Sequence, residues 1–246
     1  MRVLLEIGFE GTRYHGWQIQ ENAVTVQGVL EEALEKLLCQ PVSLAGCSRT
    51  DAGVHATQFF CHFDWQNPFP VERLPLAINP CLPPDIAVLG ARSVPDDFHA
   101  RFSCLKKTYR YRVWNARIRH PLEHSRAFFY PVRLDEKRMQ NAAEAYLGEH
   151  DFASFMAAGA TVKDTRRVIE SFCVTRRGDL VEFCVTGNGF LYNMVRIMVG
   201  TLMAECVGKL DHSIPEIIKR CDRTLAGMTV PPQGLYLEKV EYPAFD

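Results

Sequence analysis

The chain has 246 residues, of which 47% are hydrophobic and 23% charged, and its formal net charge is −1 at pH 7. This composition is typical of a soluble globular protein, and the length suits one large domain or two small ones. No apolar run is long enough for a secretory signal at the N-terminus or for a membrane span elsewhere, so we expect a cytoplasmic protein without a membrane partner. The nine cysteines lack the C-x-x-C spacing of zinc and redox sites, which favours buried, reduced thiols and no metal site.

The first hundred residues predict strands and helices that do not alternate strictly. Residues 2–9 alternate apolar and polar side chains, which predicts a strand, and residues 25–40 have apolar side chains at helical spacing, with Thr25 as the cap. A second strand is predicted over residues 57–63. The proline-rich stretch 67–85 predicts a short helix between turns.

The second half repeats a similar order of elements. In chain order, the sequence predicts a strand from residue 108, a helix over 135–147, a hairpin of strands 168–175 and 180–186, a helix over 190–207 and a strand over 235–242. We therefore expect an α+β fold of two related halves with mainly antiparallel sheets, residues 1–104 and residues 105–246. Because no low-complexity linker separates the halves, we expect an active-site cleft between them.

One loop of small residues carries a single carboxylate. The stretch GCSRTDAGVHA, residues 46–56, contains Asp51, with Arg49 two positions before it and His55 four after it. A loop aspartate often bonds its own backbone to make a turn. An arginine neighbour instead keeps a carboxylate ionised, as a nucleophile or base requires. Asp51 and His55 together also suit acid–base work or metal ligation, and these alternatives stay open.

The positive charge of the chain is concentrated in one region. Residues 1–100 have a net charge of −6, residues 101–138 of +8 and the remainder of −3. Within the basic region, KKTYRYRVWNARIRH alternates basic and aromatic residues, which predicts a strand with Tyr109, Tyr111 and Val113 on one face. Such a strand suits RNA stacking and phosphate contacts, or has an aromatic core and solvated arginines. The loop over residues 10–20 leaves the same two alternatives, RNA contact or a packed hairpin loop.

Arg196 interrupts an otherwise largely apolar helix. A guanidinium buried there needs an anionic partner, either a carboxylate or a phosphate, and Asp51 is the natural candidate. The alternative is a modest polar stripe on an exposed edge, formed with Asn193 and Gly200.

Several stretches taken together resemble one known family. The order and approximate spacing of "GTRYHGWQIQ", "GCSRTDAGVHA", "DDFHARFSCLKKTYRYRVWN", "DFASF", "TRRVI", "GNGFLYNMVRIMVGTLMAECVGK" and "PPQGLYLEKVEYP" are those seen in the tRNA pseudouridine synthase A family. The resemblance covers nearly the whole chain, and its R-T-D-A-G-V-H core is highly specific.

The resemblance implies an enzyme with the pseudouridine synthase fold. Members isomerise uridine to pseudouridine in the anticodon stem-loop of tRNA, at positions 38–40, without a cofactor or metal, and related enzymes are homodimers. By the match, Asp51 is the nucleophile, Arg49 fills the place of the extruded base and Tyr109 lies on the uracil. Arg196 is the partner expected for Asp51, and phosphates would be held by Lys106, Lys107 and Arg110.

Three other functions remain as alternatives. The chain could act on another RNA site as a paralogue, or it could be an RNA-binding module that has lost catalysis. Without the resemblance, a metal-independent hydrolase built on Asp51 and His55 is also possible, and it would need a pocket for a small substrate rather than a basic strand.

Overall fold

The structure is a computed structural model that describes residues 1–66, 70–159, 162 and 164–244. Residues 67–69 of the predicted proline-rich segment therefore lie outside the described residues. By its contacts the chain divides into two compact units, which are described one at a time. Unit 1 comprises Met1–Leu105 and Tyr236–Asp246, and unit 2 comprises Lys106–Leu235.

Unit 1 is built on a sheet of long strands with one short strand at its side. The order is β4 (Ile86–Val94), β1 (Arg2–Phe9), β3 (His55–Asp64) and β10 (Leu235–Glu241), and β2 (Ala45–Gly46) pairs with β3. β1 is antiparallel to both β3 and β4, whereas β10 is parallel to β3. The last strand of the sequence thus packs with the first half of the chain.

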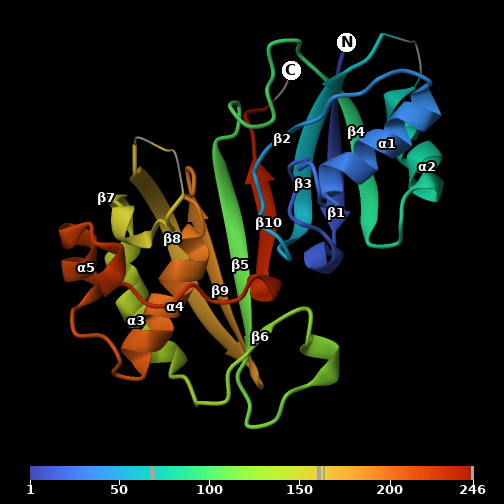
Figure 1. Cartoon of the computed structure of the whole chain (residues 1–246). Helices are drawn as coiled ribbons and strands as arrows, with labels where there is room; N and C mark the ends of the chain where they lie inside the picture. Colours follow the sequence, from blue (N-terminus) through green and yellow to red (C-terminus); the bar gives the residue numbers. More distant parts are fainter. Residues whose placement is uncertain (67–69, 160–161, 163, 245–246) are drawn as a thin grey trace. The chain divides into compact units, whose positions relative to one another are not determined.

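Two helices of unit 1 cover one face of this sheet, α1 (Val26–Leu38) and α2 (Leu74–Ile78) (Figure 1). Thr25 caps α1 as the sequence predicts, since its side-chain oxygen accepts a hydrogen bond from the backbone N of Gly28. The buried residues follow the two expected periods. Val3, Leu5 and Ile7 of β1 recur every second position, although Leu4 on the opposite face is also buried. Leu30 and Leu34 of α1 are four positions apart.

Unit 2 has an antiparallel sheet in the order β5 (Lys106–Trp114), β9 (Leu180–Gly187), β8 (Arg166–Arg177) and β7 (Gly148–Asp151). The short strand β6 (Phe128–Phe129) runs parallel beside β5. Helices α3 (Glu136–Ala143), α4 (Met194–Cys206) and α5 (Ile214–Arg220) gather on one side of the strands (Figure 1). The predicted hairpin is confirmed as β8 and β9, and its turn uses Gly178 at φ +60°.

The predicted α+β class with mainly antiparallel pairing is confirmed, and the errors are local. The helix predicted from residue 190 begins at Met194, because Asn193 at φ +59° is left-handed. Strand β4 and helix α5 were not predicted. β4 has an exposed Leu89 and is bulged opposite β1, which breaks its alternation. α5 did have a signal, the capping box of Ser213 and Glu216.

The expectation that the cysteines are buried is wrong for most of them. Only Cys47 and Cys61 are buried, and four thiols are exposed. Two of the exposed ones, Cys39 and Cys221, end helices in the left-handed region, at φ 52° and 50°, where the chain turns at the surface. In the part of the chain that the structure describes, no helix is long and apolar enough to cross a membrane.

Candidate active site

Asp51 lies half-buried in the loop between β2 and β3 of unit 1. The backbone itself closes the turn, since Val54 N donates to the carbonyl oxygen of Asp51 at 3.2 Å and Gly53 has φ +76°. Thr50, just before Asp51, is 8% exposed, whereas Arg49 is exposed. The loop therefore holds its backbone firmly and projects Arg49 to solvent.

The loop around Asp51 rests on the N-terminal loop, residues 10–17. Trp17 N donates to Thr50 O at 3.2 Å, and Gly53 N donates to Tyr14 O at 3.1 Å. The contact is close, because a Cβ added to Gly16 would collide with the carbonyl oxygen of Thr50. For this segment the sequence left RNA contact and a packed hairpin loop as alternatives. The observed backbone is that of a packed loop.

The N-terminal loop is itself anchored to unit 1 by side chains. The Tyr14 hydroxyl donates to Asp85 Oδ1 at 2.6 Å, and Arg13 Nε donates to the other oxygen of the same carboxylate at 2.6 Å. Burial, together with the bond to Asp85, raises the pKa of Tyr14 to about 12, so the hydroxyl remains a donor at neutral pH. The Trp17 ring stacks on Phe59 with 4.3 Å between ring centroids.

His55 is a buried structural group. Only 1% of it is exposed, its Nδ1 accepts a hydrogen bond from Gly11 N at 3.0 Å, and its ring stacks on Tyr236 at 4.7 Å. An imidazole whose Nδ1 is already used by the backbone is poorly suited to bind a metal or shuttle protons there. Among the described residues, no group of three or more His, Cys, Asp or Glu side chains could hold a metal ion.

In unit 2, the aromatic face of β5 is packed as the alternation predicts. Tyr109, Tyr111 and Val113 are buried, with exposures of 7%, 0% and 0%. Tyr109 meets Phe190 edge-on, with 5.0 Å between ring centroids. The Tyr111 hydroxyl donates to Pro231 O at 2.7 Å, and burial raises its pKa well above the usual value, while the positive charge of Arg196 opposes this rise.

Arg196 is half-buried on α4 and its guanidinium is held within unit 2. Its Nε donates to Val230 O at 2.7 Å, and a terminal nitrogen donates to Asn193 Oδ1 at 2.6 Å. The segment around Val230 lies tightly along α4, because a Cβ added to Gly200 would collide with Met228 O. Asp51 and Arg196 belong to different units, so their pairing stays a prediction.

The other face of β5 carries paired charges. Lys106 Nζ lies 2.9 Å from a Glu170 oxygen, and Arg110 lies 3.3 Å from Glu182. Lys107 lies on the same face as Tyr109 and is half-buried opposite Gly187. The carboxylates partly neutralise the basic strand, so a phosphate would have to compete with them. Sequence reasoning missed these pairs because Glu170 and Glu182 lie on β8 and β9, far along the chain.

Comparisons with known proteins bear on this arrangement. A family model described as "tRNA pseudouridine synthase" matches residues 7–103 and 142–243, which include Asp51 and Arg196 but leave β5 between the two matched segments. A relative named "tRNA pseudouridine synthase A" from Thermoanaerobacter sp. (strain X514) is 43% identical over 243 residues, 98% of this chain and 99% of the relative. A protein of the same name from Ruminiclostridium cellulolyticum is 45% identical over 243 residues, with the same coverage.

Among solved structures, the chain is similar to one described as "Crystal Structure of a Cbf5-Nop10-Gar1 Complex". The TM-score is 0.39 at 10% identity, over 82% of this chain and 54% of that chain, which is too distant to bear on function.

Proposed function

The chain belongs to the tRNA pseudouridine synthase family, and from that premise we propose that it converts uridine to pseudouridine in the anticodon stem-loop of tRNA. The observation that carries this proposal is the Asp51 loop. It has one carboxylate, a tightly supported backbone and an exposed Arg49, in a chain that aligns over nearly its full length with curated enzymes of that name.

Asp51 acts as the nucleophile in the proposed reaction. The bond from the ribose C1′ to N1 of uracil breaks, the base turns, and C1′ is rejoined to C5. C5 loses its proton to solvent and N1 takes up a proton, so the product has the same atoms as the substrate. The reaction is an isomerisation, so it needs no redox cofactor and no group donor. Attack by Asp51 at C6 of the base or at C1′ of the ribose requires the ionised carboxylate in either case.

Arg196 and Tyr109 serve the same step in this proposal. A guanidinium beside the carboxylate favours its ionised form, and Arg196 is already oriented by Val230 and Asn193. Tyr109 would lie against the uracil and assist the proton at C5. The buried position of Tyr109, edge-on to Phe190, supports a ring held in a fixed orientation.

The target base has to leave its stack before Asp51 can reach it, at a cost of a few kcal/mol. Arg49 is exposed and directly precedes Thr50, whose backbone is anchored, which supports its role in filling the place of the extruded base. Lys106, Lys107 and Arg110 contribute phosphate contacts, weakened for Lys106 and Arg110 by their carboxylate partners. We also propose that the protein is a homodimer and that it acts in the cytoplasm.

The test is release of tritium from tRNA labelled at C5 of uridine, without added metal or nucleotide. Wild-type protein should release tritium, and Asp51→Asn should abolish release while tRNA binding changes little. The matched control is Asp96→Asn, which removes an exposed carboxylate from the same unit and should keep full activity. Binding without release by the wild-type protein would contradict the proposal and favour a module that only binds RNA.

A further inference from the structure

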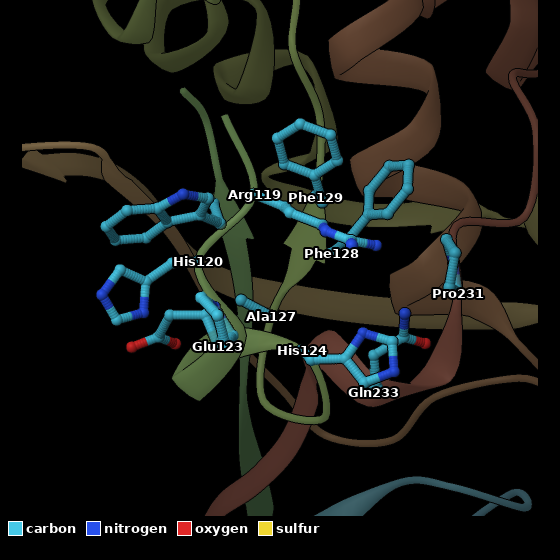
Figure 2. A pocket seen from close by; sticks show the side chains of 11 residues that line it. Arg119, His120, Glu123, His124, Ala127, Phe128, Phe129, Pro231 and Gln233 are labelled. Atoms are coloured by element: carbon cyan, nitrogen blue, oxygen red, sulfur yellow. The ribbon is translucent and has the colours of Figure 1, made fainter. Parts of the chain in front are cut away.

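Unit 2 contains a pocket of about 590 Å³ that none of the residues assigned to the reaction lines. This volume lies within the range of about 300–1,000 Å³ that is usual for small-molecule sites. Figure 2 shows the side chains around it, with Phe128 and Phe129 above and Gln233 beside His124 below. The lining residues that matter here are Trp114, Arg119, His120, Phe128, Phe129 and Gln233.

The pocket is a built feature, since its walls are fixed by hydrogen bonds. The indole Nε1 of Trp114, at the end of β5, donates to Ile118 O at 3.1 Å, and the Trp114 carbonyl accepts from Tyr130 N at 2.9 Å. Asn115 is 3% exposed and its amide nitrogen donates to both Tyr130 O and Val132 O. The loop after β5 is thus held at both ends, and the rings are positioned before any ligand arrives.

The lining offers the rings, amide and cation that a nucleotide site needs, and its carboxylate, Glu123, is paired with Arg112 at 3.3 Å. Trp114 and His120 form a ring pair with 5.2 Å between centroids, and Phe128 and Phe129 add two further rings. Flat rings of this kind stack nucleobases without regard to sequence. Gln233 supplies an amide, which both donates and accepts hydrogen bonds.

Arg119 adds a cation suited to a phosphate. Unlike Lys106 and Arg110 on β5, Arg119 is exposed and forms no ion pair with any residue that the structure describes, and the same holds for its neighbour Arg117. An unpaired guanidinium at the rim of an aromatic pocket favours a phosphate-bearing ligand.

We propose that this pocket binds one unstacked nucleotide of the bound tRNA, at a position other than the target uridine. The base stacks among the rings of Trp114 and His120, and the phosphate pairs with Arg119. This inference rests on the proposed function, because it takes the partner to be tRNA. The pocket would help to hold the substrate while contributing nothing to the chemical step at Asp51.

Tryptophan fluorescence tests the pocket without reference to activity. Trp17 and Trp65 are each 3% exposed, whereas Trp114 is only half-buried and lines the pocket, so a base stacked there should quench Trp114 selectively. The probes are hexauridylate and hexaadenylate, titrated at low salt. Trp114→Phe should remove the quenching, which assigns the signal to this pocket.

Two variants distinguish binding in the pocket from a general effect of positive charge in this loop. Arg119→Ala with His120→Ala removes a ring and the rim cation, and should weaken hexanucleotide binding by about 5- to 150-fold, the range for loss of one base stack. Arg117→Ala removes the same charge from the same loop but lies outside the lining, and should have a much smaller effect. Equal losses in the two variants would overturn the proposal.

Kinetics on tRNA then distinguish the two proposals. The double variant should raise KM for tRNA while kcat stays unchanged. Quenching by the hexanucleotides without pseudouridine formation would contradict the proposed function and leave the pocket supported. Pseudouridine formation without any quenching of Trp114 would overturn the pocket proposal alone, as would a shift from dimer to monomer in the double variant with RNA binding intact.

Discussion

The Asp51 loop in unit 1 and the Arg196 helix in unit 2 hold their functional side chains by different means. The Asp51 loop is fixed by backbone contacts that only glycine permits, at Gly11 and Gly16 of the N-terminal loop. Arg196 is fixed by its own guanidinium, which bonds Val230 O and Asn193 Oδ1. The short side chain of Asp51 can be placed only through its backbone, whereas the long side chain of Arg196 can be placed by its guanidinium group.

The largest effect is expected from Gly16→Ala. The added methyl would collide with the Thr50 carbonyl, at a residue with φ +83°. We expect a loss of about 3 kcal/mol or more in the free energy of unfolding, from overpacking and backbone strain together, and a fall in activity as the Asp51 loop shifts. Urea unfolding and tritium release measure the two effects.

Gly178→Ala is the matched control for Gly16→Ala. Gly178 also has a positive φ, +60°, but a Cβ there would meet nothing within 4 Å. It should therefore show the conformational cost alone, about 1 kcal/mol, with activity unchanged. If the two substitutions were equally costly, the close approach at Thr50 would not be what holds the Asp51 loop.

Arg196→Leu tests whether the guanidinium group holds Arg196 in place. The substitution leaves Val230 O and Asn193 Oδ1 without their donor, and we expect a loss of about 2 kcal/mol or more in stability together with loss of activity. Arg196→Lys keeps the positive charge but loses the planar guanidinium group, which can donate several hydrogen bonds in fixed directions. Partial activity in Arg196→Lys would indicate that the positive charge of residue 196 matters most. An unchanged melting temperature and rate in Arg196→Leu would contradict both its structural and its proposed catalytic role.

His62 on β3, the strand that follows the Asp51 loop, should give unit 1 a pH-dependent stability. Burial first, and the charge of Arg2 second, lower the pKa of His62 from 6.5 to about 4, and its Nδ1 accepts from Ala100 N at 3.2 Å. Between these pKa values the unfolded chain binds a proton that the folded chain does not. Stability should therefore fall as the pH drops from 6.5 to 4, by at most about 3 kcal/mol.

Urea midpoints across that range measure the effect, with His62→Gln as the test variant. Glutamine keeps an acceptor for Ala100 N but does not titrate, so the dependence on pH should become flatter. The control is His124→Gln, which replaces an exposed histidine and should leave the slope as it is. A slope unchanged in His62→Gln would assign the dependence to other groups.

The elements of both units could be predicted from sequence where the period of the apolar residues was clear, as in β1, α1 and the β8–β9 hairpin. The Asp51 loop was found by its residues, but its support by Gly16 was not, because the contact joins backbones some 35 positions apart and leaves no periodic signal. The start of α4 was missed because Asn193 is left-handed, a conformation that asparagine tolerates but that the apolar pattern of residues 190–207 does not reveal.

The smallest effect is expected at the ion pair between Lys106 and Glu170, which is a third to a half exposed. Glu170→Gln should change stability by less than about 1 kcal/mol, as is usual for surface pairs. It should also leave Lys106 better able to bind a phosphate, so tRNA affinity should rise severalfold at low salt and the rise should vanish at high salt.

Glu149→Gln, which breaks the exposed pair with Arg166 in the same unit, is the matched control. If only Glu170→Gln tightens binding, β5 is part of the RNA surface. If neither does, the basic strand is held by its carboxylates and RNA binding rests on unpaired cations such as Arg117 and Arg119.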